Sequence, residues 1–469
     1  MMIRYLVFAL LLAVCPFAVS AAELANPRTM TFPPLAFSIP KAERVLLNNG
    51  TPVYLLQDHE LPIVTVTSLI RTGSVYDPAD KSGLATLTGL QLRAGGTRTL
   101  TPAQLDAELE FMASSVESSF GDDLGKVSMT CLTKNLERTL QIFRDLLFQP
   151  GFDEKRLEVA RRQALEAIRR QNDDPKELGD RELKKAIYAG HPLGIVPVAA
   201  TLSAITRDDL VAFHQRFVRP DTMILTVTGD FDRTAMLAML NRLVGAIRAE
   251  GPLQLPQVPQ VALSFTPAVL HASKQVNQSV IRLGHLGITK DDPDLYAIRV
   301  LDFILGGSFT SRLMMEIRTN QGLAYNVSSH FDVGRRFIGN FTAETETKAE
   351  TTARTISLMT SIINSVRTAP VTDQELQLAK ESIINSFLFG FTTPASVALQ
   401  QARLEFYGYQ PDYLERYRER IAAVTSHDLL QAARKHLHPD SFKLVVVGDQ
   451  QRFDKPLSSF GTVIPLDIR

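Results

Sequence analysis

Leu-Ser-Ala-Ile-Thr-Arg-Asp-Asp-Leu at residues 202–210 recurs as Ile-Ala-Ala-Val-Thr-Ser-His-Asp-Leu at residues 421–429. The match continues without a gap as far as the Gly-Asp pairs that begin at Gly229 and Gly448. Self-similarity over about thirty residues is difficult to obtain by chance and indicates a duplicated structural unit. The chain is therefore predicted to contain two related domains. The aligned pairs are Thr206 with Thr425, Asp209 with Asp428, Pro220 with Pro439, and Gly229 with Gly448.

Each copy contains the signals of a helix followed by a strand. Thr206 and Thr425 are predicted N-caps, and the aspartate three residues later places negative charge at the positive end of the helix. The helix is predicted to end before Pro220 or Pro439, because a residue that precedes proline avoids the helical conformation. A run rich in β-branched residues follows and predicts a strand that ends at Gly-Asp.

A proline-rich segment separates the two copies. Residues 251–261 lack helical periodicity, and their composition favours an extended connection between domains. We therefore place one domain at residues 36–250 and its homologue at residues 262–469.

Within the first domain, predicted strands precede amphipathic helices. Residues 51–56 and 64–71 alternate as strands do, and residues 153–172 have a helical period. Clustered strands followed by helices predict the α+β class, in which an antiparallel-rich sheet packs helices on one face. The apolar face of the predicted helix carries Leu157, Ala160, Ala164 and Ile168.

The N-terminus has the features of a secretory signal. Arg4 precedes an apolar run at residues 5–19, and small residues follow at residues 20–22. The run is shorter than the roughly 20 residues that a membrane-spanning helix requires. We predict a cleaved signal peptide at residues 1–22, with a retained membrane anchor as the alternative. The mature protein is then exported, and it is periplasmic if the organism is a Gram-negative bacterium.

The composition limits partners and chemistry. Basic and acidic side chains number 50 each among 469 residues, a balance that does not favour nucleic acid or an anionic membrane as the main partner. After cleavage Cys131 is the only cysteine, so no intramolecular disulfide is possible. The alternating pattern around Cys131 predicts a buried apolar side chain in a strand rather than a nucleophile.

Four further segments point to a known family. They are Gly-Leu-Ala at residues 83–85, Gly-His-Pro-Leu-Gly at 190–194, Leu-Gly-Gly-Ser-Phe-Thr-Ser-Arg-Leu at 305–313 and Gly-Leu-Ala-Tyr at 322–325. Together with the duplication, they resemble the pitrilysin/insulinase superfamily of inverted-motif zinc peptidases. The most similar branch is the one with mitochondrial processing peptidase and its bacterial relatives. The resemblance covers nearly the whole mature chain, and its most specific part is the block at residues 305–325.

The zinc motif of that family is missing here. In the family two histidines one helical turn apart and a glutamate from a second helix hold Zn²⁺, and the glutamate inside His-x-x-Glu-His activates water. The resemblance places this motif on Thr86, Gly89 and Leu90, which supply one weak neutral ligand and no other donor. The third ligand position falls near Glu166, which cannot retain zinc alone and is otherwise a solvated charge on a helix. We expect no metal in this chain.

The nine histidines contain no His-x-x-Glu-His or His-x-x-x-His pair. His436 and His438 stand at a predicted helix end, where imidazole complements the helix dipole, and a zinc site there is the less favoured alternative. His191 is predicted to form hydrogen bonds in a loop, and His59 is predicted to lie on the surface.

The second domain retains residues that the resemblance links to substrate. In two-part enzymes of the family, an arginine and a tyrosine spaced like Arg318 and Tyr325 come from the domain opposite the zinc, and bind the substrate and its developing oxyanion. A fixed cation and a phenolic donor suit that chemistry. Spacing alone favours the structural alternative, in which Arg318 ends an exposed helix and Tyr325 begins a half-buried strand. The flanking family block at residues 305–325 reverses that preference. Gly306 and Gly307 stand where non-catalytic subunits have a substrate-contacting glycine loop, or they form only a turn.

The resemblance thus predicts the non-catalytic, substrate-binding subunit of an exported two-chain zinc metallopeptidase acting on unfolded peptides. Zinc is expected in a homologous partner subunit that carries His-x-x-Glu-His, in a heterodimer or a larger assembly. One alternative is a non-enzymatic scaffold or peptide-binding protein of the same fold. Another is a lone peptidase with an unfamiliar site.

Overall fold

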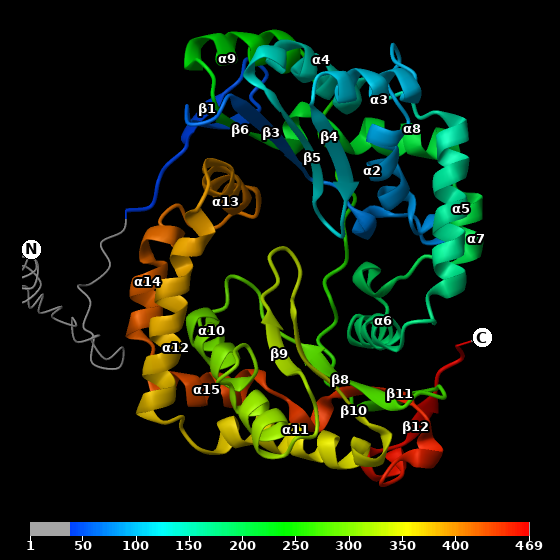
Figure 1. The fold of residues 1–469 in the computed structure, drawn as a ribbon, viewed down its shortest axis with the longest axis vertical. Helices are drawn as coiled ribbons and strands as arrows, with labels where there is room; N and C mark the ends of the chain where they lie inside the picture. Colours follow the sequence, from blue (N-terminus) through cyan, green and yellow to red (C-terminus); the bar gives the residue numbers. More distant parts are fainter. Residues whose placement is uncertain (1–37, 469) are drawn as a thin grey trace, which may run out of the picture. The chain divides into compact units, whose positions relative to one another are not determined.

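The computed structural model describes residues 38–468. The predicted signal peptide, residues 1–22, lies outside the described residues. Two six-stranded sheets form the framework, and helices pack against both (Figure 1). The fold is therefore α+β with two related halves, which confirms the fold class predicted from the sequence.

The first sheet has the strand order β1-β2-β6-β3-β5-β4. Only β2 and β6 pair in parallel within it. β6, the strand of the first repeat copy, lies inside the sheet and is buried except at Gly229. The strands are β1 (Glu43–Leu46), β2 (Pro52–Gln57), β3 (Ile63–Ile70), β4 (Ser115–Phe120), β5 (Gly125–Leu132) and β6 (Met223–Gly229).

The second sheet repeats this arrangement in the order β12-β7-β11-β8-β10-β9. β11, the strand of the second repeat copy, takes the position that β6 has in the first sheet. The outer edge differs, because β1 runs antiparallel to β2 whereas β12 runs parallel to β7. The strands are β7 (Ala268–Ser273), β8 (Gln278–Leu286), β9 (Val327–Asp332), β10 (Asn340–Lys348), β11 (Lys443–Gly448) and β12 (Val463–Pro465).

The repeated helices begin as predicted. Thr206 caps α8 (Arg207–Phe217) and Thr425 caps α15 (Ser426–His436), each in a reciprocal capping box with the aspartate three residues later. Both helices end before the aligned prolines. The other helices are α2 (Leu84–Ala94), α3 (Pro102–Phe111), α4 (Leu136–Phe148), α5 (Glu154–Arg170), α7 (Ala199–Ala204), α9 (Arg233–Leu240), α10 (Leu295–Leu305), α11 (Thr352–Thr368), α12 (Asp373–Ser386) and α14 (Tyr413–Ala423).

Two further helices cross to the sheet of the other half. α6 (Pro175–Ile187) packs on β8 and β11, and α13 (Pro394–Phe406) packs on β2 and β6. Figure 1 shows α6 beside the second sheet and α13 beside the first. Because successive strand residues face opposite sides, these helices cover the faces that each half's own helices leave open. The apolar residues of these contacts include Leu178, Leu183, Ile187, Val280 and Val445 for α6, and Ala398, Ala402, Phe406, Tyr54 and Ile224 for α13.

Arg282 of β8 secures α6 by charge. Its side chain is 4% exposed and donates hydrogen bonds to Asp180 of α6 and, over 3.0 Å, to Glu346 of β10. Removing one partner of a buried ion pair leaves the remaining charges uncompensated. We expect Arg282→Ala to lower the free energy of unfolding in urea by about 3 kcal/mol. Lys176→Ala removes an exposed partner of the same Glu346, and should change that free energy by less than about 1 kcal/mol. Equal effects of the two substitutions would contradict this role for Arg282.

Other local predictions have clear outcomes. Cys131 is buried in β5, and burial raises its thiol pKa to about 11, as expected for an unreactive side chain. Residues 251–267 contain neither helix nor strand. Within the described part of the chain, no single helix has both the length and the apolar character to cross a membrane. The helices Asp373–Phe391 and Pro394–Phe406, which meet at a bend of 107°, reach that length and apolar composition only when they are taken together.

Candidate functional site

The helix that would carry the zinc motif, α2, is held at its first turn by Asp77. The Asp77 carboxylate accepts hydrogen bonds from the backbone N–H of Gly83 and of Ala85, both at 2.8 Å. Burial raises the pKa of Asp77 to about 6 despite these bonds. Gly83 has φ 102°, a conformation that favours glycine. The start of α2 is therefore held in place by the hydrogen bonds to Asp77.

The three positions onto which the resemblance places the zinc motif lie on α2, and none of them offers an imidazole or a carboxylate. Thr86 and Leu90 are exposed one turn apart on the same helix face. Gly89 is buried, and a Cβ atom there would lie 2.5 Å from the backbone nitrogen of Phe120 on β4. Ser118 of the same strand donates a 2.6 Å hydrogen bond to the Gly89 carbonyl. The position of the general base is thus closed by backbone contact between α2 and β4.

Glu166 of α5 is engaged elsewhere. Its carboxylate pairs with Arg170 at 2.6 Å and with Arg169 at 3.2 Å on the exposed side of the helix. It belongs to no group of potential metal ligands among residues 38–468. The residues at Thr86, Gly89, Leu90 and Glu166 therefore do not fit a catalytic zinc ion.

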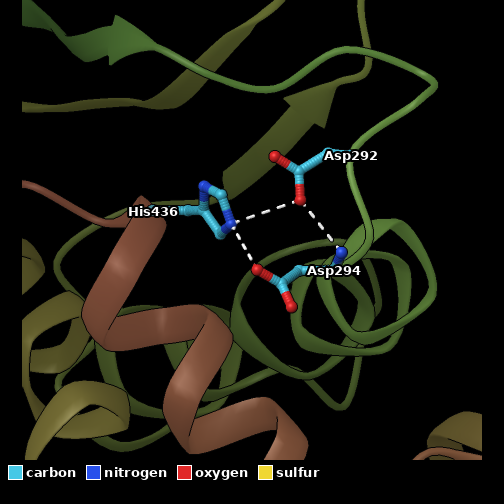
Figure 2. A group of neighbouring side chains, drawn as sticks. All are labelled: Asp292, Asp294 and His436. Atoms are coloured by element: carbon cyan, nitrogen blue, oxygen red, sulfur yellow. Dashed lines mark hydrogen bonds and ion pairs between the residues drawn. The ribbon is translucent and has the colours of Figure 1, made fainter.

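One group in the described chain has potential metal ligands close together, namely Asp292, Asp294 and His436 (Figure 2). His436 Nε2 lies 2.8 Å from Asp294, and Lys435 Nζ lies 2.7 Å from the same carboxylate. Asp292 accepts a 2.9 Å hydrogen bond from the backbone N–H of Asp294. The lysine already supplies positive charge, so the group serves as a contact between the end of α15 and the start of α10. His438 is not part of it, in contrast to the alternative of a His436–His438 site.

The remaining histidines considered from sequence lie in ordinary loop contacts. His191 bonds through Nε2 to the Pro259 carbonyl at 2.9 Å and accepts a 3.1 Å bond from Leu193 N–H at Nδ1. His59 is exposed and lies 2.7 Å from Asp230. Both match the sequence interpretation.

Arg318 and Tyr325 are brought together on the surface of the second domain. The Arg318 guanidinium carbon lies 4.9 Å from the centroid of the Tyr325 ring, and 5.9 Å from that of the Phe309 ring. Tyr325 is 84% exposed and Phe309 is 78% exposed. Within the described residues Arg318 has no carboxylate partner, and its Nη1 lies 4.0 Å from the Met314 sulfur. A guanidinium held between aromatic rings with its N–H groups unpaired is suited to bind a carbonyl or carboxylate oxygen.

The purely structural interpretation of Arg318 and Tyr325, a helix end and a half-buried strand, fits only in part. Arg318 does lie near the end of a helical segment, Met314–Asn320. Tyr325, however, precedes β9, which begins at Val327, and is fully solvent-facing rather than half-buried. Exposed aromatic side chains that face a charged group are typical of binding surfaces.

Gly306 and Gly307 have a structural explanation at the end of α10. Their N–H groups both donate to the Asp302 carbonyl, at 3.1 and 2.8 Å. A Cβ atom on Gly306 would lie 2.2 Å from the backbone nitrogen of Ser329 on β9, so this position requires glycine. A substrate contact by either glycine stays a prediction.

Sequence reasoning did not single out Phe309 or Met315. Both are exposed, and Phe309 forms the second ring beside Arg318. The available signal was a large aromatic residue in the otherwise small and polar run Gly-Gly-Ser-Phe-Thr-Ser at residues 306–311.

The duplicated fold, together with a helix α2 that lacks the zinc motif, defines a class: a zinc-peptidase framework without the His-x-x-Glu-His residues. The family model described as Insulinase (Peptidase family M16) matches residues 53–199, and the model described as Peptidase M16 inactive domain matches residues 204–383. The chain belongs to peptidase family M16, the insulinase family.

Individual relatives agree with this assignment. An uncharacterized zinc protease, YmxG, of Bacillus subtilis is 24% identical over 362 residues, or 76% of this chain and 85% of that protein. A Helicobacter pylori protein named non-peptidase homolog YmxG is 26% identical over 340 residues, or 71% and 77%. The crystal structure of a peptidase M16 inactive domain from Pseudomonas fluorescens aligns with a TM-score of 0.81 at 26% identity, and covers 89% of this chain and all of that one. The family predicted from the sequence is confirmed.

Proposed function

We propose that this chain is the substrate-binding, non-catalytic subunit of an exported two-chain zinc metallopeptidase that acts on unfolded peptides. The observation that carries the proposal is an asymmetry. The positions for metal chemistry, such as Gly89, have lost both side chain and space, whereas Arg318 and Tyr325 remain together and exposed. Random loss of function would not favour the retention of the substrate-binding residues in the second domain over the metal-binding residues in the first.

The retained pair can act on a peptide without a metal of its own. Arg318 presents unpaired N–H donors, and the neighbouring phenol of Tyr325 adds an O–H donor. Both can bind a peptide carbonyl and stabilise negative charge that develops on its oxygen. A homologous partner subunit carrying His-x-x-Glu-His would supply the zinc chemistry.

Export is part of the proposal and depends on residues 1–22. The basic residue, apolar run and small residues found there are those of a cleaved signal peptide. In a Gram-negative organism the destination would be the periplasm.

A scaffold or peptide-binding protein is the second candidate, favoured by the name non-peptidase homolog that one relative carries. Under that function, Arg318 and Tyr325 are dispensable, and no partner with a zinc motif is required. The two candidates therefore differ in whether activity appears with a partner.

A co-purification from the native organism followed by a peptidase assay tests the proposal. We expect the isolated chain to be inactive and free of stoichiometric zinc, and the partner-containing complex to cleave an unfolded peptide. Cleavage by the isolated chain with bound zinc would overturn the proposal in favour of a lone peptidase. A complex without any zinc-motif homologue and without activity would favour the scaffold.

A further inference from the structure

A large basic cavity opens in the first half, away from the residues assigned to substrate. Its volume is about 760 Å³, within the usual range of small-molecule sites. Four arginines line it and Glu250 is its one acidic lining residue. The arginines are Arg98, Arg207, Arg219 and Arg248.

Arg207, the first residue of α8, is held in place with one side of its guanidinium unused. Nε donates to the Phe152 carbonyl at 2.9 Å, and Nη2 donates to the Gly151 carbonyl at 3.0 Å. These bonds use the Nε–Nη2 edge and leave the Nη1–Nη2 edge free. No carboxylate lies within ion-pair distance of Arg207 among the described residues. Two parallel N–H groups in a fixed orientation are the geometry that binds a carboxylate in a bidentate manner.

The other arginines add charge in different ways. Arg219 is neutralised by Asp221 at 2.8 Å and also donates to the carbonyls of Glu250 and Gly251. Arg98 and Arg248 are exposed and have no ion-pair partner in residues 38–468. With Arg219 neutralised by Asp221, the remaining three arginines outnumber the single lining carboxylate of Glu250, so the cavity lining keeps a net positive charge.

The cavity lining also includes an uncharged histidine and several apolar side chains. Burial is the main cause that lowers the pKa of His214 to about 4, with a smaller contribution from the charge of Arg98. His214 Nε2 lies 2.7 Å from the Leu147 carbonyl. The imidazole is thus uncharged near neutral pH. The apolar lining residues include Phe148, Val211, Val218 and Ile247.

The backbone at the cavity is unusual at Phe152. This residue has φ 48°, a left-handed conformation that is rare for a bulky side chain and costs about 1–3 kcal/mol. Its carbonyl is one of the two that fix Arg207. Strain of this kind persists where surrounding contacts determine it, and here those contacts orient the guanidinium.

The duplication provides an internal comparison. In the ungapped alignment of the two copies, Arg207 corresponds to Ser426, His214 to Ala433 and Arg219 to His438. The second domain builds the same helix and strand without these basic residues. The fold itself therefore does not require the basic cavity.

From these observations we propose that the cavity binds a small organic acid, with its carboxylate on the free edge of Arg207 and its apolar body against Phe148, Val211 and Ile247. Arg98 and Arg248 at the rim attract the anion. This site is independent of the proposed peptidase role, because it uses neither Arg318 nor Tyr325.

Calorimetric titration of the purified chain with sodium hexanoate tests the site, with hexanamide as the neutral analogue and inorganic phosphate as an anion without an apolar body. Ionic strength is held constant. We expect saturable hexanoate binding and at least a tenfold weaker affinity for hexanamide and for phosphate. Equal affinity for hexanoate and hexanamide, equal affinity for phosphate, or no saturable hexanoate binding would each overturn the proposal.

Variants locate the binding. Arg207→Lys keeps the charge but not the planar edge, and should weaken hexanoate at least tenfold. Arg216→Lys is the matched control on α8, because Arg216 lies over the Phe217 ring outside the cavity, and it should leave the affinity unchanged. Arg98→Gln with Arg248→Gln disturbs no ion pair of the fold and should weaken binding several-fold without changing thermal unfolding. Unchanged affinity in this double variant, or an equal loss in Arg216→Lys, would count against the site.

Discussion

Arg318→Ala is expected to lower the turnover of the partner-containing complex by on the order of 100-fold, which corresponds to the loss of one donor that stabilises an oxyanion. The chain should still fold and still bind its partner, because Arg318 forms no ion pair in the described structure and its neighbouring rings are already exposed. The measurement is kcat and KM of the complex on an unfolded peptide, together with the yield of complex.

The matched control is Arg416→Ala, which removes an exposed arginine of α14 that pairs with the N-cap residue Asp412. Turnover should be unaffected. Tyr325→Phe removes only the phenolic O–H and should have a smaller effect than Arg318→Ala. If activity depends on the partner but survives Arg318→Ala unchanged, the role assigned to Arg318 is wrong while the subunit proposal stands.

The caps and strands of the two repeats could be predicted because their causes are local. Thr206 and Thr425 each bond within three residues of themselves, so the sequence contains the whole capping box. The same holds for the apolar face of α5, where Leu157 and Ala160 are buried. Local signals of this kind do not depend on the rest of the fold.

The exchange of α6 and α13 could not be predicted in this way. Their apolar residues, such as Leu183 and Ala402, require only an apolar surface, and nothing in their spacing says which sheet provides it. The opposite directions of the edge strands β1 and β12 could not be predicted either, because both strands lie outside the ungapped repeat. These choices are made by contacts between residues far apart in the chain.

The candidate site also has features that the sequence shows locally and features that depend on contacts between distant residues. The absence of zinc-binding imidazoles at Thr86 and Leu90 is a property of the residues themselves and is visible in the sequence. The second ring beside Arg318, Phe309, depends on how the segment before Met314 folds back, and only the structure reveals it. The close approach of Phe120 to Gly89 is likewise a contact between two separate elements.

That contact leads to the second large effect, because Gly89→Glu should destabilise the chain by about 3 kcal/mol or more. The added Cβ would lie 2.5 Å from the Phe120 backbone, so β4 must move, and the carboxylate would enter a buried position without a partner. Urea unfolding monitored by circular dichroism measures the change. The exposed pair Thr86→His with Leu90→His is the control, and should alter the free energy of unfolding by no more than about 0.5 kcal/mol.

The same contact predicts that restoring the motif residues does not by itself give this chain peptidase activity. Combining the three substitutions restores the letters of His-x-x-Glu-His, yet it should not restore hydrolysis, because a glutamate at position 89 cannot occupy the space held by β4. Peptide cleavage by the triple variant alone is the measurement. If that variant were as stable as the parent and cleaved peptide, β4 would yield readily, and the missing side chains alone would account for the inactivity. If the variant were destabilised and inactive, the contact between β4 and residue 89 would account for the result.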